Sequence, residues 1–402
     1  MLRYLRTALL LLTLALTLLL IVWNTGIHRT PLPGSAGEMQ QVEALLRTWK
    51  APMHHDLPWR MQQHFPEGAG FAYALYGLAN CQAARWSGPD RASAHLAEAA
   101  WSLEHLESDT LASYFPLLPP ERGVFLAGWQ AYLQGSLLAA AGAAPSAEEL
   151  LAHMRRCDEL AEAFRGSDSP FLASYPDGAW PADNTVAVAA LALYDAHWPS
   201  RYADVIERWV EDVRRTMPAD GRMAHAWDPA GDTARITMRG SSLALMCIFL
   251  PAIAPDLAEA QFAAFQRAFF AERFGVPVIT EHPWNAWGEG DVDSGPLILG
   301  VGPVATIVGA GACRVNGDAL HDLEMSSTVD AFGLVMGGKE RRYLFGAMPM
   351  ADLFIAWCRS MPVPEGAAPV RPRYLRFHLW SLLFAAMLWS PWLWRSLRRN
   401  RG

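Results

Sequence analysis

Charged side chains are scarce in this sequence, and those present do not gather into a basic region. Only 18% of the 402 residues are charged, whereas 52% are hydrophobic, and the formal net charge is -7. No stripe of Lys and Arg crosses the middle of the chain. Because recognition of phosphates needs clustered basic side chains, we do not expect nucleic acid as a partner.

Several motifs that identify common catalytic and cofactor sites are also missing. The chain has no GxSxG elbow, no P-loop and no HExxH. The segment "GEGDVDSG" lacks the third acidic position and the closing Glu of a calcium loop. The glycines of "GVGPVATIVGAGA" lack a preceding strand and dinucleotide spacing, so close helix packing explains them better. We therefore expect neither a metal nor an organic cofactor.

Cysteines are few and widely spaced. Their number is odd, and they form no CxxC pair and no Cys/His metal spacing. Each lies within a predicted helix, which favours small buried hydrophobic side chains over disulfides or metal ligands. The five are Cys81, Cys157, Cys247, Cys313 and Cys358.

Two long apolar segments are present, one near each end. The run Thr7–Trp23 follows Arg3 and Arg6 and is near the lower length limit of a spanning helix. An uncleaved anchor is favoured over a signal peptide, because no small-residue cleavage site follows the run. The run Phe377–Trp394 has no Asp, Glu, Lys or Arg, and its alternative interpretation is an amphipathic helix lying on the membrane.

Basic residues outside both runs favour a cytoplasmic location for both termini. We accordingly expect a protein of the inner membrane whose main domain faces the periplasm, with the lipid bilayer as a partner. The expected domains are an anchor over 1–26, a helical domain over 27–366, and a transmembrane helix with a basic tail over 367–402. The sequence leaves open whether the chain forms a homo-oligomer.

Between the anchors, apolar residues recur at helical spacing in successive pairs of helices. The first helix of each pair is apolar all round, as in "NTVAVAALALYDA", while the second carries a charged stripe, as in "RYADVIERWVEDVRRTM". A helix that is apolar all round is buried, and one with a polar face looks outward. This alternation predicts an all-α (α/α)6 toroid, with Leu191, Leu245 and Leu299 on inner helices and Glu207 and Arg208 on an outer one. The expected pairs are 70–87 with 90–107, 123–142 with 146–166, 183–197 with 200–216, 240–252 with 255–274 and 295–315 with 317–335, with a further pair over 38–63 and a last helix over 350–360.

Each predicted inner helix follows a loop of Pro, Gly, aromatic and charged residues, such as "YPDGAWPADN", "TMRGSS" and "WGEGDVDSG". Inner helices of a toroid run in the same direction, so these loops should meet at one mouth, where helix N-termini stabilise negative charge. Two carboxylates in different environments can serve as acid and base. The expected proton-transfer groups are Asp183, Asp291 and Asp293, although helix capping is the alternative for Asp183 and Asp293. The expected substrate-binding residues are Glu67, Tyr175, Trp180, Asn184, His225, Arg239, His282, Trp287 and Glu289.

The loops "YPDGAWPADNTVAVAALALYDAHW", "RGSSLAL" and "GDVDSGPLILGVG" resemble, in this order, the linalool dehydratase/isomerase family over roughly residues 60–340. That resemblance implies an (α/α)6 toroid and cofactor-free dehydration and isomerisation of a terpene alcohol. The family's site uses cysteines beside Asp, Tyr, His and Glu, whereas no cysteine of this chain lies in a mouth loop.

The function expected from the sequence is therefore acid–base catalysis by a lyase or isomerase acting on a hydroxylated, largely apolar small molecule. Tyr175, Trp180 and Trp287 would form its apolar wall and stabilise a developing cation. A carbohydrate-active hydrolase or lyase of the same fold is the alternative enzyme, since Trp and paired carboxylates also suit sugars. A non-catalytic binding protein of the cell envelope is the third alternative.

Overall fold

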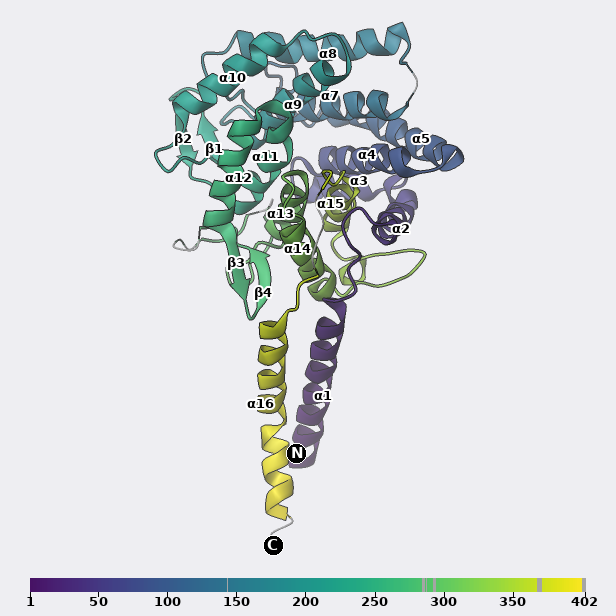
Figure 1. Ribbon diagram of the computed structural model, residues 1–402, viewed down its shortest axis with the longest axis vertical. Coiled ribbons are helices and arrows are strands. Elements are labelled where there is room, and N and C mark those ends of the chain that lie inside the picture. The colour runs from purple at the N-terminus through teal and green to yellow at the C-terminus, as the bar shows by residue number, and fades with distance from the viewer. Residues whose placement is uncertain (143, 284–285, 287, 292–293, 367–370, 400–402) are drawn as a thin grey trace.

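The computed structural model describes residues 1–142, 144–283, 286, 288–291, 294–366 and 371–399. A body made mostly of helices lies at one end of the molecule, and two long helices extend from it side by side (Figure 1). The two are α1 (Leu2–Gly26) and α16 (Leu375–Arg399), which together form the stalk. The chain therefore enters and leaves the body at the same place.

Six helices form a closed inner ring, in which each contacts the next and the last contacts the first. The ring consists of α4 (Gly68–Trp86), α7 (Gly123–Ala140), α9 (Pro181–His197), α11 (Gly240–Ile253), α13 (Pro303–Val315) and α15 (Pro349–Ser360). The inner surfaces are almost entirely Ala, Gly, Leu, Val and aromatic residues, so these helices are buried on nearly every side. The described part of the chain is thus an (α/α)6 toroid, as the helix alternation predicts.

An outer layer of helices covers the ring, and most of these helices present a charged stripe to solvent. Five of them follow their inner partners directly: α5 (Pro89–Leu106), α8 (Ala147–Arg165), α10 (Ala203–Thr216), α12 (Pro255–Phe269) and α14 (Ala319–Phe332). Leu191 and Leu245 lie on inner helices, and Glu207 and Arg208 lie on the outer helix α10, as predicted.

The sixth outer helix comes from the other end of the chain. Helix α2 (Ala36–Met53) packs against α15 and α4, whereas α3 (Leu57–His64) packs mainly on α4. The expected pair over 38–63 is therefore present as α2 and α3, but the inner helix that α2 covers is α15, from the end of the body. The sixth inner–outer pair consists of α15 and α2, which lie at opposite ends of the body's sequence. This pair closes the ring.

One predicted inner position is also wrong. Leu299 lies outside α13, on an exposed turn, because Leu299 and Gly300 both adopt a positive φ that no helix can contain. The helix begins only at Pro303, whose fixed φ suits the first helical position. The apolar composition of 295–302 indicated a longer helix, but local backbone conformation prevails.

The remaining described elements are short. They include two antiparallel hairpins, and the second of these follows α12 and points toward the stalk (Figure 1). The short elements are α6 (Asp109–Ala112), η1 (Leu344–Gly346), β1 (Ala226–Asp228) with β2 (Thr233–Ile236), and β3 (Phe270–Arg273) with β4 (Val276–Ile279).

Aromatic side chains fill the axis of the ring. The ring of Trp129 lies 5.6 Å from Phe71, 5.8 Å from Phe249 and 5.9 Å from Trp357, measured between centroids. These four residues come from four different inner helices, so together they close the passage through the toroid. All five cysteines are buried and unpaired within helices, as expected for packing residues.

A buried ion cluster ties the chain-closing helix α2 to the ring. The Arg314 guanidinium, only 1% exposed, pairs with Glu38 at 2.5 Å and with Asp322 at 2.8 Å. These residues lie on α13, α2 and α14 respectively. Because a buried charge without its partner is strongly unfavourable, this cluster specifies where α2 docks.

Within the described residues, α1 is the helix that is long and apolar enough to cross a membrane, and α16 falls short of that criterion. The two helices are nevertheless joined by side-chain hydrogen bonds between them. Asn24 Nδ2 donates to Ser381 Oγ at 2.8 Å, and Trp389 Nε1 donates to Thr17 Oγ1 at 3.0 Å. The stalk is therefore one packed unit.

Candidate active site

The N-terminal ends of the inner helices meet at one end of the ring, which we call the mouth. Backbone hydrogen bonds join neighbouring loops there: Val124 N to Ala173 O (3.2 Å), Trp227 N to Ala179 O (2.8 Å) and Gly240 N to Glu281 O (2.9 Å). The loops that precede α7, α9, α11 and α13 are thereby held together. The rings of Phe71, Trp129, Phe249 and Trp357 fill the axis of the toroid, which leaves the rim of the mouth as the place for a ligand.

Glu281, which follows β4, is the most deeply buried acid of the mouth, with 0% of its surface exposed. Ser241 donates to it twice, from Oγ at 2.7 Å and from the backbone N–H at 3.3 Å. The carboxyl group lies between the starts of α11 and α13, where a Cβ on Gly240 would meet Thr280 O at 2.1 Å and a Cβ on Gly302 would meet Glu281 Oε2 at 3.0 Å. Glycine at both positions is what lets the acid fit between two helix ends.

Burial raises the pKa of Glu281 to about 7, although the hydrogen bonds from Ser241 act in the opposite direction. The Asp291 carboxylate also raises this pKa, while Arg239 lowers it. At neutral pH the Glu281 carboxyl therefore keeps its proton far more readily than an exposed glutamic acid does. A pKa near the working pH is what an efficient general acid requires.

Asp291 has the opposite character. Its carboxylate pairs with the Arg239 guanidinium and accepts the backbone N–H of Ser294 at 2.9 Å. Burial alone would raise the pKa of Asp291, but the hydrogen bonds from Ser294 and the charge of Arg239 outweigh it and lower the pKa. Asp291 is thus ionised at neutral pH, beside an acid that is partly protonated.

Arg239 also offers a hydrogen bond. Its Nε–H is buried and has no hydrogen-bond partner among the described residues, whereas the guanidinium end pairs with Asp291. A buried donor without an acceptor is unfavourable, and a ligand oxygen placed there would satisfy it. Arg239 can therefore both hold Asp291 ionised and bind a substrate oxygen.

Two histidines border the same cluster. His225 directly precedes β1, and its Nδ1 lies 2.6 Å from Ser242 Oγ. Burial, followed by the charge of Arg239, lowers the pKa of His225 to about 4, so its ring is neutral at pH 7. His282 Nε2 lies 3.1 Å from the carbonyl oxygen of Glu289 and so holds the acidic loop in place. The side chain of Glu289 itself is exposed.

A second group at the mouth is centred on Tyr175. Its hydroxyl donates to the Glu67 carboxylate, and its ring stands perpendicular to Trp180 with the centroids 5.7 Å apart. Phe115 stacks on the other side at 6.4 Å. Burial raises the pKa of Glu67, although the Tyr175 hydrogen bond lowers it. This group presents an aromatic surface with one carboxylate.

The two predicted residues in the first turn of α9, Asp183 and Asn184, bind other groups of the protein itself. Asp183 Oδ2 accepts the Ser174 hydroxyl at 2.6 Å, and it does not cap α9, whose N-cap is Trp180. Asn184 is fully buried, and its amide bonds the backbone of Leu172 in both directions, at 2.7 and 3.0 Å. Asn184 thus positions the loop, because its amide is not available to a substrate.

Two predicted residues, Asp293 and Trp287, lie outside the described residues. Conversely, Glu281, Ser241 and Ser242 lie in the site although the sequence patterns do not indicate a role for them. The one available signal was an acid directly after the apolar strand segment "VPVIT". The burial of Glu281 depends on Gly240, which lies far before it in the chain, and on Gly302, which follows it. No local sequence pattern reveals that arrangement.

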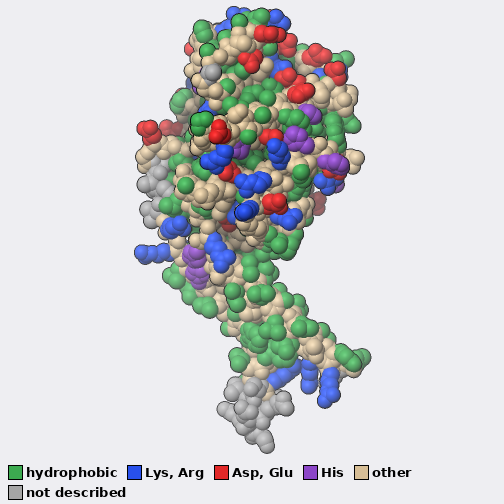
Figure 2. Space-filling view, turned by 90° about the vertical axis from the view of Figure 1, so that its right-hand side faces the viewer, with side chains coloured by type: hydrophobic (Ala, Val, Ile, Leu, Met, Phe, Trp, Pro, Cys, Tyr) green, Lys and Arg blue, Asp and Glu red, His purple; other side chains and the backbone are tan. Residues whose placement is uncertain are grey.

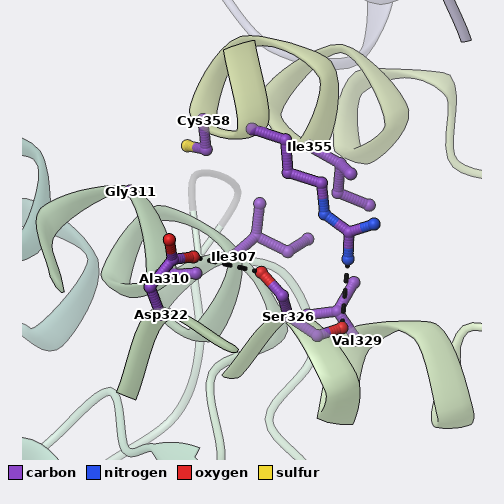
Figure 3. Close-up of a pocket in the computed structure, with 9 residues that line it drawn as sticks. Ile307, Ala310, Gly311, Asp322, Ser326, Val329, Ile355 and Cys358 are labelled. Carbon is purple, nitrogen blue, oxygen red and sulfur yellow. Dashed lines mark hydrogen bonds between the residues drawn. The ribbon is translucent and has the colours of Figure 1, made fainter. Parts of the chain in front are cut away.

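Two cavities lie away from the mouth. The smaller one lies between α13, α14 and α15 and measures about 10 Å³, at the lower limit for a single water molecule. Its polar wall is already satisfied, since Ser326 bonds both Asp322 and Arg359 (Figure 3). The other, about 360 Å³, is an open groove beside α8 and α10, lined in part by Arg165, Asp204 and Arg208. Neither is lined by Glu281, Asp291 or Glu67.

No protein-family model and no curated protein matches this chain. Among solved structures, a GH76 α-mannanase of Bacteroides thetaiotaomicron is similar with a TM-score of 0.44 and 10% identity, over 72% of this chain and 84% of that one. An unsaturated glucuronyl hydrolase is similar with a TM-score of 0.44 and 11% identity, over 71% of this chain and 84% of that one. Both are (α/α)6-toroid enzymes. At this level of similarity, neither indicates what this chain acts on.

Proposed function

We propose that this chain is a membrane-anchored toroid enzyme that transfers protons to and from a hydroxylated, largely apolar molecule, as a lyase or isomerase does. The observation that supports this most strongly is the contrast between the two acids Glu281 and Asp291 at the mouth. The two carboxyl groups interact electrostatically, and their surroundings shift the two pKa values in opposite directions. Such a divergence assigns the roles of acid and base within one site.

In the proposed elimination, protonated Glu281 gives its proton to the substrate hydroxyl, the C–O bond breaks, and water leaves. Ionised Asp291 takes the proton from the neighbouring carbon as the C=C bond forms. Solvent then returns that proton from Asp291 to Glu281, so the protein is unchanged. The two helix N-termini beside Glu281 stabilise the carboxylate formed when the proton leaves, and the Arg239 Nε–H binds a substrate oxygen.

Burial by itself would not justify this role. Asp352 is fully buried too, and burial raises its pKa to about 7 as well. However, its carboxylate accepts Trp49 Nε1 at 3.0 Å and the Tyr343 N–H at 3.2 Å, which fixes the start of α15 against α2. Glu281 differs because the charges of Asp291 and Arg239 act on it, and Arg239 has a buried Nε–H without a partner among the described residues.

Hydrolysis or lysis of a carbohydrate is the second candidate. The perpendicular pair Tyr175 and Trp180, beside Glu67, offers the aromatic surface and carboxylate that sugar rings bind. This group shares the mouth with Glu281. The products of turnover distinguish the two candidates.

We further propose that the stalk lies in the inner membrane, with the body in the periplasm. The length and composition of α1 support this, and only 6% of its most apolar segment is buried within the protein. Figure 2 shows an apolar stalk, with Lys and Arg side chains where it meets the body and again toward its far end. Hydrogen bonds between α1 and α16 offset the lower hydropathy of α16, because its polar groups are satisfied within the pair.

The test is a turnover screen with the full chain in lipid vesicles, supplied with extracts of membrane lipids and with saccharides. Products are followed by mass spectrometry for the loss of water, for the gain of water, or for a change of structure at constant mass. Glu281→Gln should lower turnover by about 10²–10⁴-fold, because an amide of the same shape cannot supply the proton. Turnover should also fall as the pH rises through about 7, where Glu281 loses its proton. Equal turnover by Glu281→Gln and the unmodified protein would refute the proposal.

A further inference from the structure

The β3–β4 hairpin links the start of the stalk to the mouth. At its tip, the Phe274 ring stands perpendicular to Trp380 of α16, with the centroids 5.9 Å apart. A Cβ on the adjacent Gly275 would lie 2.3 Å from Phe377 N, so the tip touches the backbone of α16. Glu272 pairs with Arg376 at 3.1 Å. Figure 1 shows the hairpin pointing toward the end of the body from which the stalk extends.

The other end of this hairpin reaches the buried acid. Strand β4 continues through Thr280 into Glu281, five residues beyond Val276, a span of roughly 16 Å in extended chain. Val276 is packed with Ile27 and Phe377 at the head of the stalk. The acid is therefore about half a bilayer thickness from the first turns of α16.

A turn over residues 298–301 lies between the hairpin and Glu281. Arg273 Nε donates to Leu299 O at 3.2 Å, and Glu281 N donates to Gly300 O at 3.2 Å. This turn therefore touches both the hairpin and the backbone of the proton donor.

Large apolar side chains on the hairpin tip, on the turn 298–301 and on the neighbouring part of α16 are exposed to solvent. Phe274 is 58% exposed, Ile298 65% and Leu299 62%, and the neighbouring Trp380 of α16 is 49% exposed. We call these four the apolar strip. An exposed group of this kind indicates a surface that contacts lipid or protein. Since the strip is continuous with the stalk, the lipid bilayer is the occupant that its position favours, and tryptophan is typical of that boundary.

We infer that the mouth takes its substrate from the bilayer, and that the substrate is an amphiphile with a hydroxylated head and a long hydrocarbon chain. The head reaches Glu281 and the Arg239 Nε–H, while the chain lies along the strip toward the membrane. This inference rests on the proposed function, since it names the substrate class of the same site. It explains why a mouth with polar catalytic groups is bordered by exposed leucine, isoleucine and phenylalanine.

The test begins with contact to a lipid-borne probe. The full chain is placed in phosphatidylcholine–phosphatidylglycerol vesicles that contain a long-chain alcohol bearing a diazirine on its chain, and cross-linked residues are mapped by mass spectrometry. Labelling is expected at 274 and 298–301 as well as on α16. In the double variant Phe274→Asn/Leu299→Asn, labelling at the turn should fall by about tenfold. Labelling confined to α1 and α16 in the unmodified protein would overturn the inference.

The variants suit the backbone, because Phe274 and Leu299 both have a positive φ, which asparagine tolerates better than they do. Phe345→Asn is the matched control, since Phe345 is 68% exposed and also has a positive φ, but lies on η1. It should label like the unmodified protein. A comparable loss of labelling in the control would show a general effect on membrane insertion and would also overturn the inference.

Kinetics separate this inference from the proposed function. For a substrate found in the screen, kcat/KM is measured with the vesicle-borne molecule and with a short-chain, water-soluble analogue. The double variant should lower the ratio of the two by about tenfold, because only the long chain uses the strip. If Glu281→Gln is inactive while this ratio is unchanged, the proposed function stands and the inference fails. If the ratio falls while Glu281→Gln stays active, delivery along the apolar strip is supported and the proposed role of Glu281 fails.

Discussion

Replacing Glu281 with glutamine is expected to stabilise the protein at alkaline pH, although it removes the proton donor. The pKa of this group rises from its ordinary value of 4.5 to about 7 on folding. Between these pH values the folded protein keeps a proton that the unfolded chain has released, so stability falls as the pH rises. A pKa difference of one corresponds to about 1.36 kcal/mol, so the complete cost above the folded pKa is roughly 3 kcal/mol.

Glutamine has the same shape, can still accept the Ser241 hydroxyl, and never becomes charged. The melting temperature of the Glu281→Gln variant should therefore exceed that of the unmodified protein by on the order of 5 °C at about pH 8.5. At about pH 4.5 the two melting temperatures should be equal. The 17 tryptophans provide an intrinsic fluorescence signal for thermal unfolding in detergent. Asp352, whose pKa burial also raises to about 7, is present in both proteins, so its contribution cancels.

The matched control is Glu259→Gln, because Glu259 is an exposed acid on the outer helix α12. Its melting temperature should follow that of the unmodified protein at every pH. A Glu281→Gln variant that melts lower at alkaline pH, or that differs by the same amount at all pH values, would refute the argument. The first result would mean that the carboxylate is stabilised in place, and the second that the amide only disturbs packing.

Two further predictions concern the ring closure and the stalk. Glu38→Ala should destabilise the protein by about 3 kcal/mol or more, because it removes one of the two acids that pair with fully buried Arg314. Glu43→Ala, which breaks the more exposed pair with Arg91, should cost about 1 kcal/mol or less, and equal losses in chemical denaturation would contradict the buried-cluster argument. Reporter fusions after Gly26, after Gly366 and at the C-terminus should read periplasmic, periplasmic and cytoplasmic, and a cytoplasmic signal at Gly366 would exclude the proposed topology.

The toroid could be predicted from the sequence because the degree of burial of each helix determines how its apolar and polar residues are distributed around it. Inner helices such as "NTVAVAALALYDA" are apolar all round, and outer helices are not, whichever partner each one meets. The error at Leu299 has a different origin. Periodicity reports which residues are apolar, but it does not report a positive φ, so an exposed apolar turn was taken for the first turn of α13.

The candidate site was only partly predictable for a related reason. Asp291, Arg239 and His225 were expected at the mouth because loops before inner helices must meet there, and the structure brings these three together. Glu281 was missed because its character comes from burial between two helix ends that are distant in sequence. Asn184 is the opposite case. It is a polar residue at the mouth, but its amide is already occupied by hydrogen bonds to the backbone of Leu172.

The pairing of α2 with α15 has a consequence for biosynthesis. A chain made from its N-terminus has produced α2 long before α15, so during most of translation α2 can pack against α4 but not against α15. Until α15 arrives, α4 and α13 lack a neighbour in the ring, and their apolar faces remain open to aggregation. Helix α1, which precedes α2, contacts α16, which follows α15. Pairing of α1 with α16 and closure of the ring would therefore reinforce each other as one late, cooperative step.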